Sequence, residues 1–138
     1  MEKNFVFNDD SISVQVGDHY FDLHNCFDLT GLAVDFVQKQ VTLSFTGFQP
    51  EALSKHVMKL ELMVLDIDFL SLSNGAISKM SSDVEELGYK PFNDFDHDWL
   101  VNEKSMKSTD HLFIRLAEDE FVRIHGKSAQ VFFEQSVC

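Results

Sequence analysis

Three residues early in the chain carry side chains that metal ions bind. Asp22, His24 and Cys26 occur at alternate positions. On a β-strand, alternate residues share a face, so their carboxylate, imidazole and thiol groups would point the same way. Such a set suits zinc or a similar transition metal. The spacing matches no established metal signature, so the favoured interpretation is that no metal binds here.

A second acidic group lies further along the chain, at Asp94, Asp96, His97 and Asp98. Aspartates at alternate positions are typical of calcium loops. Those loops also need a glycine and a distal glutamate at fixed positions, and this segment has neither. We therefore interpret the group as a solvated turn.

A pair of carboxylates, Asp66 and Asp68, lies in the most apolar part of the chain. Paired carboxylates can perform acid–base chemistry when their environments differ. The simpler interpretation is a solvated strand face, whose charges discourage aggregation through an exposed strand. The sequence contains no nucleophile elbow and no glycine-rich phosphate loop. We therefore predict no enzymatic activity and no cofactor.

Aromatic and acidic residues are interleaved between Tyr89 and Trp99. Aromatic anchors surrounded by charge are typical of the residues that contribute most to protein–protein binding. The alternative is that the rings cover a sheet or the open end of a barrel while the aspartates face solvent, and both can hold at once. The candidate partner-binding residues are Phe92, Asp94, Phe95, Asp96, Asp98 and Trp99.

The charge of the chain restricts its partners. Eleven basic residues against 23 acidic ones give a net charge of −12. Nucleic acids and anionic lipids both require a basic surface, so we expect neither as a partner. A basic protein would be attracted instead. The alternative is that the acidity only keeps a phenylalanine-rich domain in solution.

Length predicts a single domain over residues 1–138, and the lack of a secretory signal together with two reduced cysteines favours the cytoplasm. No apolar run approaches the roughly 18 residues of a membrane span. The first ten residues lack the cationic and apolar regions of a secretory signal. The two cysteines show no metal spacing, and a pair of reduced thiols is preferred to a Cys26–Cys138 disulfide.

The longest apolar stretch is residues 57–73, and we expect the other elements to pack against it. Its residues alternate as in a strand, but the alternation changes phase near residues 64–65 and again near 69–70. Either bulges interrupt one long strand, or the strand bends from one sheet into another. A helix over residues 57–65 is the less favoured alternative.

The remaining patterns predict mostly strands. Residues 32–45 read as a β-hairpin, and residues 112–133 as a three-stranded meander. A capping-box pattern at 82–85 and Gly88 predict a short helix over 83–87, while residues 93–101 are a second short helix or a loop. The fold class is therefore mainly β (α+β): an antiparallel sandwich or partly open barrel of about eight strands, with one or two short helices.

The order of these features resembles a known class of proteins. The run L-H-N-C at 23–26, the hairpin, the apolar strand, E-L-G-Y at 86–89 and the C-terminal strands are similar to small bacterial β-rich proteins of unassigned function. Some of these are grouped with the immunity proteins of contact-dependent or polymorphic toxin systems. The resemblance implies a cytoplasmic, non-enzymatic, acidic domain that binds a partner. It assigns no functional residues.

Three functions remain open at this stage. The preferred one is a non-catalytic, acidic protein-binding domain, such as an immunity-type inhibitor of a basic toxin. A small barrel that binds an apolar small molecule among its phenylalanines is the second. A metal-dependent enzyme that uses His24 with Asp22 or Cys26 is the third. A homodimer through an exposed strand and Phe132 is compatible with each.

Overall fold

The computed structural model describes residues 1–47 and 57–135 of the chain. The fold is mainly β, which confirms the predicted fold class. The described residues also contain three short 3-10 helices, η2 (Ile77–Lys79), η3 (Glu103–Ser105) and η4 (Ala117–Asp119). The strands are β1 (Glu2–Lys3), β2 (Val6–Phe7), β3 (Ser13–Val16), β4 (His19–Asp22), β5 (Phe27–Asp35), β6 (Gln40–Gly47), β7 (Val57–Leu65), β8 (Phe69–Leu72), β9 (Glu86–Lys90), β10 (His111–Arg115), β11 (Phe121–His125) and β12 (Ser128–Gln135).

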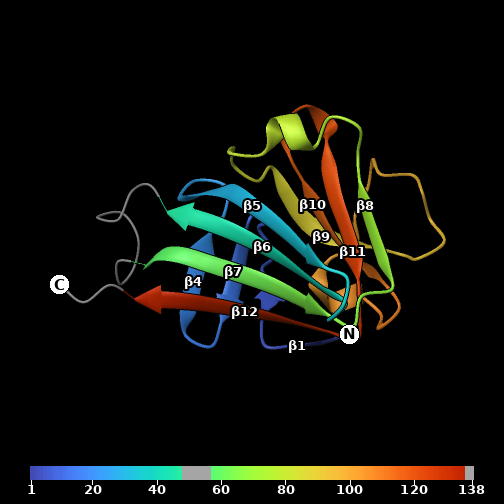
Figure 1. Cartoon of the computed structure of the whole chain (residues 1–138), viewed down its shortest axis with the longest axis horizontal. Coiled ribbons are helices and arrows are strands. Elements are labelled where there is room, and N and C mark those ends of the chain that lie inside the picture. The colour runs from blue at the N-terminus through green and yellow to red at the C-terminus, as the bar shows by residue number, and fades with distance from the viewer. Residues whose placement is uncertain (48–56, 136–138) are drawn as a thin grey trace.

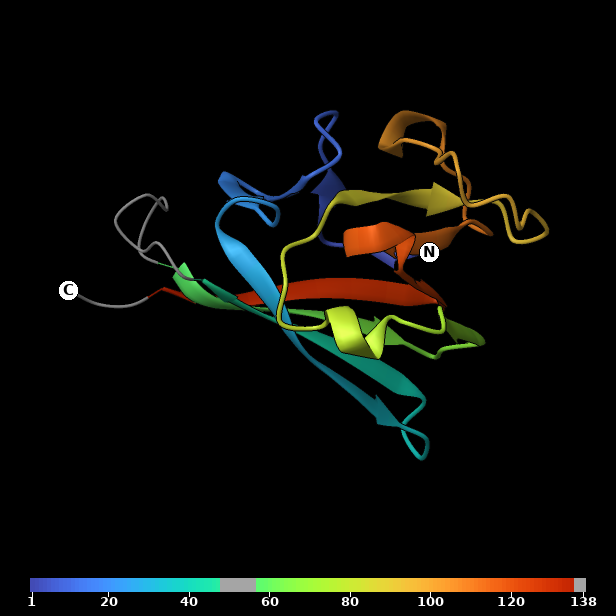
Figure 2. The same ribbon diagram turned by 90° about the horizontal axis from the view of Figure 1, so that it is seen from above.

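The strands form three sheets. The largest has the order β1-β12-β7-β6-β5, a second has the order β8-β11-β10-β9, and a third has the order β2-β3-β4. The largest sheet runs across the front of Figure 1. Seen from above, the three-stranded sheet and β9 lie on one side of it (Figure 2). Within the described residues the sheets stay separate, so the architecture is a sandwich and not a closed barrel.

The core lies where the sheets face one another. Alternate residues of β6 and β7 point inward, because neighbouring side chains on a strand point to opposite faces. Each buried aliphatic or aromatic side chain contributes about 1.5–3 kcal/mol relative to an exposed one. The inward-facing residues of these two strands are Val41, Leu43, Phe45, Leu60, Leu62 and Val64, all at most 3% exposed.

The central apolar stretch does bend between sheets. Strand β7 pairs with β6 and β12 in the five-stranded sheet, whereas β8 pairs with β11 in the four-stranded sheet. Between them, Asp66 has a left-handed φ of 50°. The first change of alternation therefore marks a crossing between sheets, and the helix alternative for residues 57–65 is wrong.

A second crossing lies directly against the first. The chain leaves β11 in the four-stranded sheet, passes Gly126 and enters β12 in the five-stranded sheet. The backbone N–H of Lys127 donates to the Leu65 oxygen at 3.0 Å. A Cβ atom on Gly126 would lie 2.4 Å from that same oxygen, so only glycine fits. The predicted meander is thus correct for β10 and β11 but wrong for β12.

The predicted helix at 83–87 is also wrong. Residues 86–90 form β9, which pairs with β10 from Glu86 opposite Arg115 to Lys90 opposite His111. The Ser82 hydroxyl donates back to the Lys79 oxygen and not forward as a helix cap would. Pairing with a distant strand has overridden the local capping pattern.

Gly88, expected to end that helix, lies in the middle of β9. A Cβ atom there would lie 2.8 Å from the Leu100 Cβ atom. The glycine therefore allows the segment that contains Leu100 to cross close over the strand. Residues 93–101 form turns and an isolated bridge, so the loop alternative is correct for this segment. No helix in the described part of the chain has the length and apolarity needed to cross a bilayer.

Candidate functional site

The four-stranded sheet buries two cations on the face turned away from the core. Arg123 on β11 is 1% exposed, and Lys90 at the end of β9 is 0% exposed. A buried cation is tolerated only where hydrogen bonds replace the lost water. The segment that follows β9, residues 91–100, supplies those bonds. We call this segment the acidic–aromatic loop.

Arg123 holds the first half of the loop by its backbone. Its Nη1 atom donates to the Asp94 oxygen at 2.8 Å, and its Nη2 atom donates to the Pro91 and Phe92 oxygens at 3.0 and 3.3 Å. Its guanidinium also lies 4.8 Å from the centre of the Phe95 ring. Because one planar guanidinium group binds three backbone carbonyls, it fixes the path of the loop over the sheet.

Two histidines accept the remaining donors of Arg123. Nε reaches His111 Nδ1 at 2.9 Å, and Nη1 reaches His97 Nε2 at 2.8 Å. A ring nitrogen that accepts from a guanidinium carries no proton, so both rings are neutral. Burial, followed by the Arg123 charge, lowers the pKa of His97 and lowers the pKa of His111 to about 4.

Lys90 holds the second half of the loop. Its Nζ atom donates to the Trp99 oxygen at 2.7 Å and lies 3.3 Å from the centre of the Trp99 ring. The Asp94 carboxylate lies 3.6 Å from the same ammonium group. Burial lowers the pKa of Lys90, and the nearby Asp94 charge opposes that shift. Both ends of the loop are therefore fixed by a buried cation.

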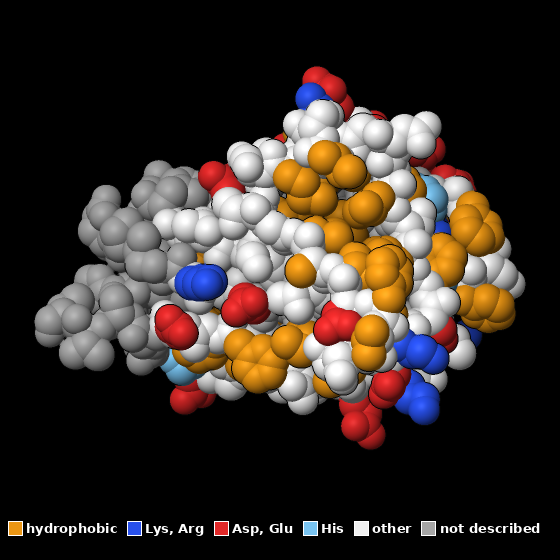
Figure 3. All heavy atoms as spheres, in the orientation of Figure 1, with side chains coloured by type: hydrophobic (Ala, Val, Ile, Leu, Met, Phe, Trp, Pro, Cys, Tyr) orange, Lys and Arg blue, Asp and Glu red, His pale blue; other side chains and the backbone are white. Residues whose placement is uncertain are grey.

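The loop presents its aromatic side chains to solvent. Phe92, Phe95 and Trp99 are 56%, 66% and 44% exposed. The loop projects at the right of Figure 1, and Figure 3 shows apolar side chains gathered at that end of the surface. The rings of Phe95 and Trp99 also lie over the buried Arg123 and Lys90, so the alternative in which the rings cover a sheet is correct in part. Their role in binding a partner stays a prediction.

The aspartates of the loop have different roles. Asp94 is partly buried, and its carboxylate accepts from the Asp96 N–H at 2.8 Å. The Asp96 carboxylate accepts from the Asp98 N–H at 3.1 Å. These turns leave Asp96 and Asp98 exposed beside the rings. Asp94 therefore stabilises the loop, while Asp96 and Asp98 supply its surface charge.

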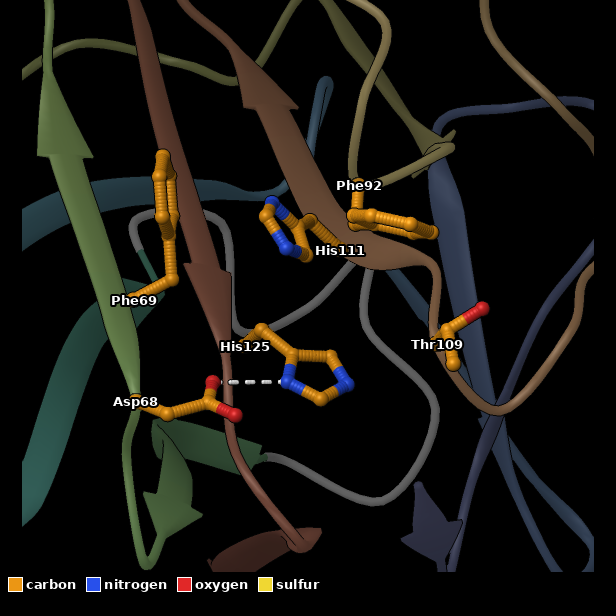
Figure 4. Close-up of a pocket in the computed structure, with 6 residues that line it drawn as sticks. All are labelled: Asp68, Phe69, Phe92, Thr109, His111 and His125. Carbon is orange, nitrogen blue, oxygen red and sulfur yellow. Dashed lines mark hydrogen bonds and ion pairs between the residues drawn. The ribbon is translucent and has the colours of Figure 1, made fainter.

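Hollows open on both sides of Phe92. One, of about 450 Å³, lies between Phe92 and Lys107. The other, of about 360 Å³, is shown in Figure 4, and we call it the histidine hollow. Phe92 and Thr109 line both. The lining of the histidine hollow is Asp68, Phe69, Phe92, Thr109, His111 and His125.

An acid–histidine pair lies at the foot of the histidine hollow. The Asp68 carboxylate is 2.7 Å from His125 Nδ1, and the Ser108 oxygen is 3.0 Å from His125 Nε2. A general base needs its second nitrogen directed at a nucleophile. Here a backbone carbonyl occupies that nitrogen, so the pair is not arranged as a catalytic dyad.

The first candidate metal group does not lie on a single strand, so its side chains do not share a face as a strand would arrange them. Residues 23–26 form a turn, in which the Asp22 carboxylate accepts from the backbone N–H groups of His24 and Asn25 at 3.0 and 2.8 Å. The His24 ring turns away, with Nδ1 2.7 Å from the Val84 oxygen. The described residues contain no group of three or more His, Cys, Asp or Glu side chains placed to hold a metal ion.

Asp66 and Asp68 are both exposed, as the simpler interpretation expects, but they do not lie on a strand. Both residues lie in the crossing between β7 and β8, where Asp66 turns with a positive φ. Asp68 reaches across to His125 on β11. The aspartates of the second predicted metal group form the exposed turns of the loop, and its His97 points inward to Arg123.

The sequence interpretation missed the residues that hold the loop. Arg123 lies on the side of a predicted strand opposite the core, His111 directly precedes the predicted meander, and Lys90 follows the predicted helix, so none of them stood out as a buried residue. One signal was available: Phe113 and Phe121 occupy the same side of β10 and β11, and Phe113 is fully buried. Aromatic residues on the polar side of a strand indicate that another layer covers that face.

Comparisons with known proteins add no relative: no family model and no curated protein matches the sequence, and no solved structure matches the fold.

Proposed function

We propose that this protein is a non-catalytic, acidic, cytoplasmic domain that binds a basic protein through the acidic–aromatic loop. One observation supports this most directly. Phe92, Phe95 and Trp99 are exposed side chains on a loop whose backbone is held by buried Arg123 and Lys90. The rings of Phe95 and Trp99 also cover the buried cations, but the exposed surface of all three rings is available to a partner.

Fixing the loop before binding lowers the entropy that binding costs. Each mobile side chain or loop residue ordered at an interface costs about 0.5–1.5 kcal/mol. Here the carbonyls of Pro91, Phe92 and Asp94 are already positioned in the free protein. The hollows beside Phe92 would receive side chains from the partner, which is the usual arrangement around binding hot spots.

Charge selects the class of partner. Asp96 and Asp98 lie exposed beside the rings, and the whole chain carries a net charge of −12. This surface attracts a basic protein and accelerates its association. It repels nucleic acid and anionic lipid. An inhibitor of a basic toxin, as in immunity proteins, is the specific form of this function that we favour.

The experiment is a binding titration with the basic proteins encoded next to this chain in its genome. Truncating a hot-spot residue costs about 2 kcal/mol or more, so Phe95→Ala should weaken the complex about 30-fold. Phe132→Ala is the matched control, because Phe132 is also exposed but lies on β12 in another sheet. If Phe95→Ala combined with Trp99→Ala leaves each complex intact, the loop is not the interface.

Self-association is a separate proposal that this function allows. Strand β1 pairs with β12 at Ser128 and Ala129, and the Asn4 side chain bonds the N–H and the oxygen of Val131. Within the described residues, the edge of β12 is therefore uncovered only beyond Val131, where Phe132 is exposed. A second copy would bind there through its own β12. Sedimentation at increasing concentration would detect a dimer, and Phe132→Glu should abolish it; a monomer throughout would exclude it.

A further inference from the structure

The histidine hollow has the size and walls of a small ligand site. Its volume of about 360 Å³ lies at the lower end of the range for such sites. The Phe69 ring lies 4.4 Å from the His111 ring, centre to centre, and Phe92 forms another wall. Figure 4 shows His111 at the head of the hollow, between these two phenylalanines and above His125. A flat aromatic ring would pack against the exposed faces of Phe69 and Phe92.

His111 supplies a hydrogen-bond donor at the head of the hollow. Its Nδ1 atom accepts from the Arg123 Nε atom at 2.9 Å, so its proton lies on Nε2. The side chain is only 5% exposed. Within the part of the chain that the structure describes, no acceptor is placed on Nε2, although the ring lines the hollow. An N–H group in such a place binds a ligand oxygen when one is present.

The charges and hydrogen-bonding groups of the hollow favour a neutral ligand. An ammonium or guanidinium group would be attracted by Asp68, but it would offer no acceptor to the His111 N–H. A carboxylate would face Asp68, which lines the hollow, and the net charge of −12. A purely apolar ring would leave the His111 N–H unpaired. A neutral oxygen on an aromatic ring would accept from the His111 N–H, while the ring itself packs against the phenylalanine walls.

We propose that the histidine hollow binds a phenol. The ring packs against Phe69 and Phe92 beside His111, and the hydroxyl oxygen accepts from His111 Nε2. The hydroxyl proton is donated to Thr109 or to Asp68, both of which carry oxygen acceptors at the hollow. The phenol is either a free small molecule or a tyrosine side chain of the bound protein. In the second case, the inference rests on the proposed function; in the first it does not.

The test is a two-dimensional NMR titration of the full chain with p-cresol, toluene and p-toluate. We expect saturable p-cresol shifts at Phe69, Phe92, Thr109 and His111. Toluene lacks the hydroxyl and should bind about tenfold more weakly or worse, because both hydrogen bonds of the hydroxyl are lost. Equal affinity for p-cresol and toluene, tighter binding of p-toluate, or shifts confined to other residues would overturn the proposal.

Two variants locate the hydrogen bond. In His111→Asn, the amide oxygen can still accept from Arg123, but the donor at the Nε2 position is gone. The preference for p-cresol over toluene should therefore disappear. Thr109→Val is the second variant, because Thr109 is exposed and its change should not disturb folding. It should weaken the binding of p-cresol but not that of toluene. An unchanged preference for p-cresol over toluene in both variants would contradict the proposal.

N-acetyl-tyrosinamide distinguishes the two sources of the phenol. If it shifts the same residues with the affinity of p-cresol, the hollow accepts a tyrosine side chain. If p-cresol binds and the tyrosine derivative does not, the ligand is a free phenol. Binding of neither overturns the inference. Phe95→Ala, which tests the loop interface, should leave p-cresol binding unchanged, because Phe95 does not line the hollow.

Discussion

The backbone oxygen of Asp94 lies 2.8 Å from the Nη1 atom of Arg123, a residue 29 positions away in the sequence. This bond ties the acidic–aromatic loop to the middle of β11. It also explains why an arginine is buried without a carboxylate at hydrogen-bonding distance: carbonyl oxygens and two imidazoles occupy its donors. The exposure of Phe95 and Trp99 follows from this buried contact.

Replacing Arg123 with methionine should therefore release the loop. The carbonyls of Pro91, Phe92 and Asp94 would lose their donor in a partly buried place, and each such loss costs about 1 kcal/mol or more. We expect a loss of about 3 kcal/mol in the free energy of unfolding, measured with urea. Hydrogen exchange should also increase at residues 91–98. A loss below about 0.5 kcal/mol would contradict the role given to Arg123.

The stability of the protein should fall between pH 6.5 and pH 4. The pKa of His111 drops from 6.5 to about 4 on folding, mainly because the ring is buried and secondly because Arg123 is adjacent, with His125 adding to the effect and Asp68 and Asp110 opposing it. Below pH 6.5, His111 is protonated in the unfolded chain but stays neutral in the folded chain. The contribution of neutral His111 to the free energy of unfolding is therefore complete above pH 6.5. It declines by up to about 3 kcal/mol as the pH falls to 4.

Urea titrations at several pH values would measure this decline. Carboxylates also titrate in the same range, so the informative quantity is the difference between the original chain and His111→Asn. The variant has no imidazole at this position, and its stability should depend less steeply on pH between 6.5 and 4. Parallel curves for the two proteins would show that His111 does not carry the effect.

Local alternation made the strands predictable, whereas the contacts that hold the loop were not. The hairpin at 32–45 and the crossing after Leu65 could be read from period-two patterns, because each has one face in the core. The aromatic residues of the loop stood out by composition. Arg123 did not, because its partners are mainly backbone carbonyls, which every residue has. The prediction of a helix at 83–87 was wrong because the pairing of β9 with β10 depends on residues distant in the sequence.

Gly126 should be among the least replaceable residues of the chain. Its Cβ position lies 2.4 Å from the Leu65 oxygen, a backbone atom that cannot rotate away. Gly126→Ala must therefore separate the two crossings between sheets, which should cost about 2 kcal/mol or more. Gly31→Ala is the matched control, since its Cβ would meet the Ser44 Cβ at 3.4 Å, and should change the melting temperature far less. Equal melting temperatures for both variants would refute the close approach.

Trp99 offers a direct optical measurement of the loop, because it is the sole tryptophan of the chain. The Lys90 ammonium lies 3.3 Å from its ring centre and donates to its backbone oxygen. Lys90→Met would remove both contacts while keeping a long side chain under the loop. We expect a red-shifted emission and stronger quenching by acrylamide, because the ring becomes more mobile and more hydrated. Lys104→Met is the control: Lys104 is also a lysine, but its side chain is 80% exposed, and its change should leave the emission as it was. An unchanged spectrum in Lys90→Met would contradict the role given to Lys90 in holding Trp99.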